Sequence, residues 1–154
     1  MPKPFRLVGA EAIEDLLKQL PPNVARNVTN QSLRAGAGVI ANAARANIRA
    51  NGSIDSGLLL KRIAVETQRR PNQGQAEVIV GVKGGTAIVV RKGKTKPMRA
   101  TPRRYAHLVE FGTEHSAAEP FMRPAVDGSG SKALAKVVEA AASGLARVTA
   151  KLKR

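Results

Sequence analysis

The sequence predicts an α+β fold in which a long helix and a C-terminal helix pack on a small antiparallel sheet of about three to four strands, in two layers. Two observations indicate the helices: residues 24–48 and 132–152 repeat apolar side chains every three or four positions, which is the period of a helix. A third indicates the sheet. Between those helices lie three short β-rich runs separated by turn residues, a pattern typical of an antiparallel meander.

Two helices are predicted in the N-terminal third, after a flexible arm over residues 1–10 that contains two prolines. Residues 11–20 space four apolar side chains as on one helical face, and two prolines then end that helix. Its acidic side chains lie early, where the positive end of a helix favours them. The long helix follows, and we expect its exposed side to carry Arg34, Arg45 and Arg49.

The middle of the chain is expected to form the sheet. Asp55 or Ser56 can cap a short helical turn at residues 58–60. Short turns, the first at residues 71–74, join three expected strands, over residues 62–70, 76–82 and 86–91. Residues 11–154 would form a single domain, since this length suits one core.

Residues 92–103 show no periodicity and contain two prolines, so they predict a basic loop. A short helix is expected over residues 104–111. A loop would then cover residues 112–130, with one helical turn after Pro124, before the C-terminal helix begins at residue 132.

The composition limits the core and the chemistry. The apolar residues are mostly alanine and valine, with three Phe and no Trp, so the core is thin and would gain from packing against other copies of the chain. The absence of cysteine excludes disulfides and thiolate metal sites. No run of residues is apolar enough to span a bilayer, and we expect no membrane partner and synthesis in a cytoplasm.

The net charge is +15, and the excess is concentrated in residues 61–104, which hold twelve Lys or Arg against two Glu. Seven of these residues lie in or beside the predicted basic loop, residues 91–104: Arg91, Lys92, Lys94, Lys96, Arg99, Arg103 and Arg104. Two interpretations stay open. The loop contacts DNA or an acidic partner, or it is a solvated loop that keeps the protein soluble.

No catalytic, metal or cofactor site is predicted. His107 and Glu110 would share a helical face, but Gly112 interrupts the helix and no third ligand is evident. The glycine-rich run at residues 81–86 lacks the order of a phosphate-binding loop, and a hairpin turn explains it better.

Residues 105–127, YAHLVEFGTEHSAAEPFMRPAVD, hold three of the four aromatic residues and are called here the signature segment. Gly112 would provide a sharp exit from the short helix, two prolines would stiffen an extended approach to the core, Phe121 would anchor the segment, and Arg123 would point outward. We expect the short helix to seat four side chains in the core, those of Tyr105, Leu108, Val109 and Phe111. The segment therefore predicts a rigid contact surface.

The blocks YAHLVEFGT and AAEPFMRPAV resemble the signature of a tail-component family of long-tailed bacteriophages. That signature is Tyr-Ala-x-x-Val-Glu-Phe-Gly-Thr, then a variable loop, then Pro-Phe-hydrophobic-Arg-Pro-Ala. Upstream, DSGLLLKRI resembles the family's Thr/Ser-Gly-x-Leu-x-x-Ser-Ile turn, with Arg62 where serine is common.

The resemblance implies a neck protein without catalysis or cofactor, that is, a head–tail joining or tail-completion protein. Such a protein would form a ring of six or twelve copies in the virion, after assembly in the host cytoplasm, bound to other neck, connector and tail proteins. The matching positions, expected to shape the fold and the ring contact, are Tyr105, Glu110, Phe111, Gly112, Thr113, Pro120, Phe121, Arg123 and Pro124. The alternative is a basic protein that binds nucleic acid without sequence specificity.

Overall fold

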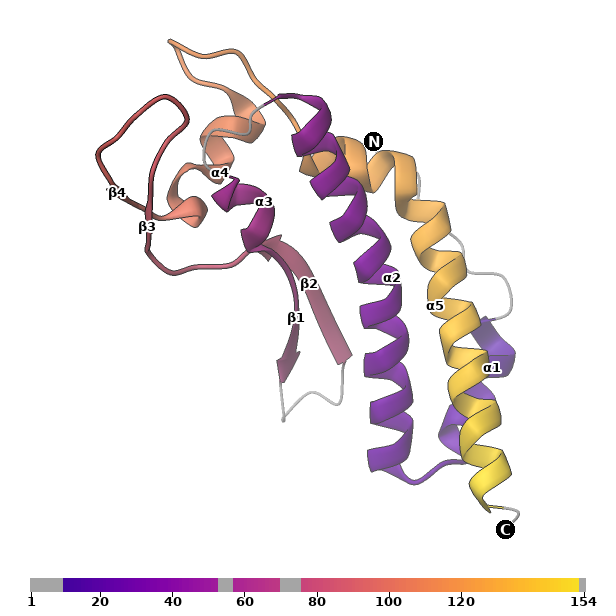
Figure 1. Cartoon of the computed structure of the whole chain (residues 1–154). Coiled ribbons are helices and arrows are strands. Elements are labelled where there is room, and N and C mark those ends of the chain that lie inside the picture. The colour runs from indigo at the N-terminus through magenta and orange to yellow at the C-terminus, as the bar shows by residue number, and fades with distance from the viewer. Residues whose placement is uncertain (1–9, 53–56, 70–75, 153–154) are drawn as a thin grey trace. The chain divides into compact units, whose positions relative to one another are not determined.

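The computed structural model describes residues 10–52, 57–69 and 76–152. Its elements are α1 (Ala10–Lys18), α2 (Pro22–Ala50), α3 (Leu58–Arg62), β1 (Ile63–Arg69), β2 (Ala76–Val82), β3 (Ala87–Val89), β4 (Met98–Ala100), α4 (Pro102–Phe111) and α5 (Met122–Leu152) (Figure 1). The predicted α+β class is confirmed. The expected arm up to residue 9, the cap at residues 55–56 and the turn at 71–74 lie outside the described residues.

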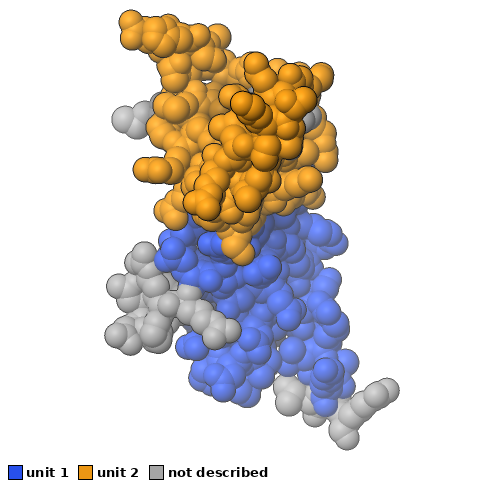
Figure 2. Space-filling view, turned by 60° about the vertical axis from the view of Figure 1, so that its left-hand side comes forward, with its two compact units in different colours: residues 1–39, 65–79, 129–154 blue, residues 40–64, 80–128 orange. Residues whose placement is uncertain are grey.

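The chain divides into two compact units, coloured separately in Figure 2. The first unit comprises residues 1–39, 65–79 and 129–154, and the second comprises residues 40–64 and 80–128. The expected single domain over residues 11–154 stays a prediction.

In the first unit, α2 and α5 lie side by side because glycines let them approach closely (Figure 1). A Cβ atom added at Gly36 would lie 2.4 Å from Val137 Cγ2 and 2.7 Å from the Ala133 carbonyl oxygen. One added at Gly144 would lie 3.0 Å from Val28 Cγ1. The buried side chains around these contacts are mostly small, as the composition predicted: Val28, Ser32, Ala133, Ala141 and Leu145.

We expect Gly36→Ala to lower the free energy of unfolding by about 1–3 kcal/mol, because the new methyl group would overpack against a backbone carbonyl that cannot move aside. Gly38→Ala is the matched control, since nothing lies within 4 Å of its Cβ position. That change should stabilise the helix by about 0.5–1 kcal/mol. Denaturant titration of both variants measures the difference, and equal stabilisation by both would refute the close packing.

The core of the second unit is formed by the end of α2, by α3 and by the start of α5. Its buried apolar side chains are Ala41, Ala44, Ile48, Leu58, Leu59, Ile63, Phe121 and Ala125. Arg45 was expected on the exposed side of the long helix, but it is half-buried and donates from Nη2 to the Ile63 carbonyl oxygen at 2.7 Å. Arg34 and Arg49 are exposed as predicted.

The predicted single meander is wrong, because the four strands form two separate two-stranded sheets, β1 with β2 and β3 with β4. After β2, a turn at residues 83–86 redirects the chain, with Gly85 at φ 108° and Arg62 Nη1 donating to the Gly84 carbonyl oxygen at 3.1 Å. β3 therefore pairs antiparallel with β4, and Val89 lies opposite Met98. Part of the predicted basic loop is thus a strand.

The C-terminal helix begins at Met122, ten residues before the predicted start. The run Gly128-Ser-Gly-Ser131 has poor helix propensity, so the periodicity was interrupted there and indicated a loop. Pro124 is tolerated in the first turn of α5, where its missing N–H would have no partner within the helix.

Candidate assembly interface

The signature segment begins within α4, which ends at Phe111 and is followed by Gly112 as the predicted exit. Gly112 has φ 77°, a left-handed conformation, and its N–H donates to the Leu108 carbonyl oxygen at 2.8 Å. A Cβ atom there would lie 2.8 Å from the Ala118 nitrogen. The Glu119 N–H donates to the Val109 carbonyl oxygen at 2.8 Å, so the loop folds back on the helix that precedes it. Glycine is therefore required at this exit.

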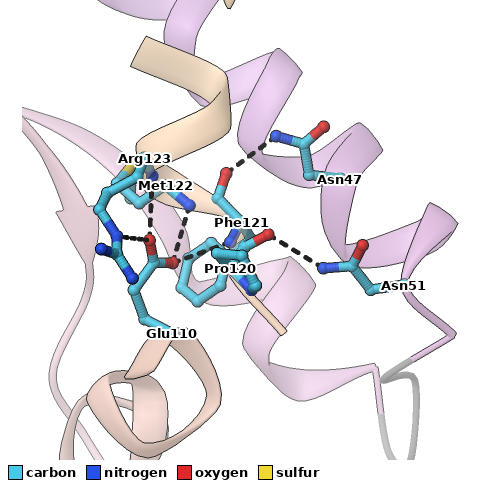
Figure 3. A network of polar contacts seen from close by, with 7 residues as sticks. All are labelled: Asn47, Asn51, Glu110, Pro120, Phe121, Met122 and Arg123. Carbon is cyan, nitrogen blue, oxygen red and sulfur yellow. Dashed lines mark hydrogen bonds and ion pairs between the residues drawn. The ribbon is translucent and has the colours of Figure 1, made fainter. Parts of the chain in front are cut away.

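Glu110 is the most buried charged side chain among the described residues, and it caps the N-terminus of α5 (Figure 3). Its Oε2 accepts backbone hydrogen bonds from Phe121 at 2.8 Å and Met122 at 2.9 Å, and its Oε1 accepts one from Arg123 at 3.0 Å. The first N–H groups of a helix lack partners within it, and the helix dipole favours an anion there. One carboxylate thus joins α4 to α5.

The pKa of Glu110 lies below its ordinary value of 4.5. Burial alone would raise this pKa, because it penalises the charged form. Hydrogen bonds from the N–H groups of Met122, Arg123 and Phe121, together with one from the Arg123 side chain, lower it by more than burial raises it. The cap is therefore built for the ionised carboxylate.

This shift gives stability a pH dependence. Because the folded-state pKa of Glu110 is depressed, its contribution is fully present above the unfolded-state pKa and is lost as the pH falls through the folded-state pKa. We expect the difference in free energy of unfolding between the wild type and Glu110→Gln to shrink as the pH is lowered from 7 through this range. Denaturant titrations at a series of pH values measure it. A difference that stays constant or grows on acidification would contradict the ionised cap.

Two asparagines bind the carbonyl oxygens of the backbone segment that leads into α5 (Figure 3). Asn47 Nδ2 donates to the Phe121 carbonyl oxygen at 3.0 Å, and Asn51 Nδ2 donates to the Pro120 carbonyl oxygen at 3.0 Å. The sequence reasoning missed both of these asparagines. Their spacing of four places both amides on one face of a helix, which was the available signal.

Phe111 and Arg123 lie together on the surface. Phe111 was predicted to seat in the core, but its residue is 65% exposed, and Leu108 is exposed as well. The Arg123 guanidinium lies over the Phe111 ring, 4.8 Å from its centroid, and Nε is 3.5 Å from Glu110 Oε1. In α4 the side chain that points into the core is that of Glu110, so the neighbouring Phe111 ring stays on the surface. Arg123 is mostly exposed, in line with the predicted outward direction.

The other signature residues differ in burial. Phe121 is buried at 2% exposure, as an anchor should be, and Tyr105 and Pro120 are half-buried. Thr113 is exposed and forms a short backbone bridge with Ser116. Pro124 is exposed in the first turn of α5, so it does not stiffen an extended approach as predicted.

The basic residues lie in and beside the β3–β4 hairpin, and all seven are exposed. They are Arg91, Lys92, Lys94, Lys96, Arg99, Arg103 and Arg104. Their exposure makes them accessible to an anionic partner, and no base-reading element accompanies them in the described residues.

The part of the chain that the structure describes offers no evident catalytic constellation. No group of three or more His, Cys, Asp or Glu among those residues is placed to hold a metal ion. His107 is exposed, whereas the Glu110 carboxylate is occupied by the α5 cap. Among the described helices, none is long and apolar enough to cross a membrane.

A family model matches residues 11–112, which is more than half of the chain. It describes bacteriophage tail components like HK97 gp10, and the match runs from α1 through the exit glycine of α4. No curated protein and no solved structure matches the chain. The family indicated by the YAHLVEFGT motif is confirmed: the chain belongs to the HK97-gp10-like family of bacteriophage tail components.

Proposed function

We propose that the chain is a head–tail joining, or tail-completion, subunit that assembles as a ring of six or twelve copies in the neck of the virion. Each ring would contact other neck, connector and tail proteins, and its role would be structural, without catalysis. The family assignment supports a structural part in a phage tail. The finer role rests on one further observation, the surface formed by Phe111 and Arg123.

Aromatic residues and arginine are enriched in protein interfaces relative to the rest of the surface, so an exposed ring with an arginine stacked on it suits an interface. Here both side chains are held in place, because Glu110 fixes the end of α4 to the start of α5. A rigid surface loses little entropy on binding. Identical copies that join head to tail through such a surface close into a ring when the rotation per copy permits it.

The assembly role predicts that Phe111→Ala leaves folding nearly intact, lowering the free energy of unfolding by less than about 1 kcal/mol, because the ring is exposed. The same change should reduce incorporation into particles about tenfold or more. Quantitative blotting of purified particles measures incorporation. Ile88→Ala, which removes another exposed apolar side chain, is the control and should be incorporated normally. Normal incorporation of Phe111→Ala would contradict the interface.

Gold labelling tests the location directly. Particles assembled with a C-terminally tagged chain should bind antibody at the junction of head and tail. Label only along the tail tube or at its tip would refute the neck assignment, and so would mature particles that contain no copy of the chain.

A second candidate function is nucleic-acid binding without sequence specificity, which the exposed basic hairpin favours. It predicts tight binding of the purified chain to free duplex DNA, falling steeply as salt increases. Binding that is weak at physiological salt and unchanged when Arg99 and Arg104 are replaced by Gln would exclude it. Within the neck, the same residues would face DNA in the channel or an acidic surface on the next ring.

A further inference from the structure

The second unit contains an apolar pocket to which neither Phe111 nor Arg123 contributes. Its volume is about 510 Å³, within the range of protein ligand pockets. Its lining residues come from the end of α2, from α3, from the β3–β4 hairpin and from α4, and all of them belong to this one unit. The pocket is therefore a feature of the second unit alone.

The inner lining of the pocket is apolar. Ile48, Leu58 and Leu59 are buried, and Val89 of β3 is half-buried. Met98 of β4, which lies opposite Val89, is 42% exposed. A cavity of this kind accepts aliphatic or aromatic side chains, and side chains that fill such pockets carry most of the binding energy of protein interfaces.

The opening of the pocket is positively charged. Among the described residues that line it, the charged ones are Arg91, Arg99 and Arg104, and none is acidic. All three arginines are exposed, and neither Arg99 nor Arg104 forms an ion pair with a described Asp or Glu. Thr101 at the N-terminus of α4 also lines the pocket, so the positive end of that helix dipole adds to the charge of the arginines.

An apolar interior with a positive opening favours a ligand that joins an apolar anchor to carboxylates. Arginine suits carboxylates, because its planar guanidinium can bind both oxygens at once. A nucleic acid fits less well, since the polar edges of its bases would be buried against apolar side chains. A tail component assembles with other phage structural proteins, so a protein segment is the ligand that matches both features of the pocket.

We propose that the pocket binds an acidic segment of a neighbouring protein in the particle, with apolar side chains inside and carboxylates on Arg99 and Arg104. One copy can then hold a like copy through the surface around Phe111 and Arg123 and an unlike protein through the pocket. This inference rests on the proposed function, in which each ring contacts other neck, connector and tail proteins.

Fluorescence anisotropy with the purified full chain tests the site. The probe is a labelled synthetic peptide, Glu-Glu-Leu-Phe-Glu-Glu, and a panel of related peptides varies the apolar pair. We expect the probe to bind about tenfold more tightly than a peptide with Ser-Ser at the pair, or than one with Lys in place of Glu. Failure of every acidic apolar peptide to bind, or equal binding of the Ser-Ser peptide, would overturn the proposal.

A variant of the apolar lining locates the binding at the pocket. Met98→Glu places a carboxylate at the pocket in place of an exposed apolar side chain, and it should weaken binding of the probe about tenfold or more. Val126→Glu makes the same kind of change at a residue of α5 that is 38% exposed and does not line the pocket. Its binding should stay within about twofold of the wild type. Equal binding by both variants would overturn the proposal.

A variant of the opening decides the matter if Met98→Glu does not fold. Arg99→Gln with Arg104→Gln should also weaken binding about tenfold. Lys61→Gln with Lys83→Gln removes the same charge from exposed positions of the second unit outside the pocket, and should change binding less than about threefold. Equal losses in the two pairs, with complete displacement of the probe by duplex DNA, would mean that the peptide responds to overall charge, and would overturn the proposal.

The proposed function can survive the loss of this inference, because gold labelling of the neck is an independent measurement. Absence of label at the neck would refute the function itself, whereas specific binding of the probe peptide by the purified chain would remain.

Discussion

Replacing Glu110 with alanine is expected to lower the free energy of unfolding by about 3–5 kcal/mol, because it removes the acceptor of three charge-assisted backbone hydrogen bonds. The change leaves the N–H groups of Phe121, Met122 and Arg123 without their acceptor at the start of α5. Water cannot replace the acceptor fully, because the Phe121 N–H bond is buried. The helix also loses an anion at the positive end of its dipole.

Glu110→Gln removes the negative charge of the side chain but keeps nearly the same shape. It keeps one oxygen acceptor but places an NH₂ group against the remaining backbone donors, so we expect a smaller loss of about 1–3 kcal/mol. Denaturant titration at neutral pH measures both variants. A loss below about 1 kcal/mol in Glu110→Ala would show that the cap contributes little to the junction of α4 and α5.

Phe121→Ala is expected to destabilise the fold by about 3–5 kcal/mol, because it removes a ring that is 2% exposed and leaves a cavity in the core of the second unit. Loss of the ring also loosens the backbone that Asn47 and Glu110 hold by hydrogen bonds.

Phe111→Ala is the internal control for this prediction. It removes the same side chain ten residues earlier, but from a position that is 65% exposed. Thermal and chemical unfolding should therefore show that Phe121→Ala lowers the free energy of unfolding by at least about 2 kcal/mol more than Phe111→Ala does. Equal losses, or a loss below about 1 kcal/mol in Phe121→Ala, would mean that Phe121 is no anchor.

The helices could be predicted from the sequence wherever periodicity was unbroken. α1, α2 and the later part of α5 repeat apolar residues at helical spacing, and their positions were confirmed. The first ten residues of α5 could not be predicted, because Gly128 and Gly130 lower helix propensity. The carboxylate that caps this helix lies in α4, eleven residues before Phe121, and no local rule connects the two.

The sheet was harder to predict because its strands are short. β1 and β2 carry enough β-branched residues to be recognised, whereas β4 has only three residues, in a segment rich in charge and proline. The glycines of the connection at residues 83–86 permit several chain directions, so the sequence could not show that β3 pairs with β4 rather than with β2.

Within the signature segment, roles that follow from one residue's type could be predicted, whereas roles set by contacts between residues could not. Gly112 at the exit and Phe121 in the core follow from residue type. Phe111 was assigned to the core by the same reasoning, and it was wrong because Glu110 occupies the inward position beside it. The asparagine pair at Asn47 and Asn51 acts on backbone about seventy residues away, which the sequence alone could not indicate.

In the proposed neck, identical copies dock through the surface around Phe111 and Arg123 into a closed ring. A reconstruction of intact particles at a resolution that traces the backbone would test this arrangement. We expect a closed ring of this chain between head and tail, in which residues 105–127 of each copy contact a neighbouring copy or the adjoining neck protein. A neck without this chain, or a ring in which those residues contact no neighbour, would contradict it.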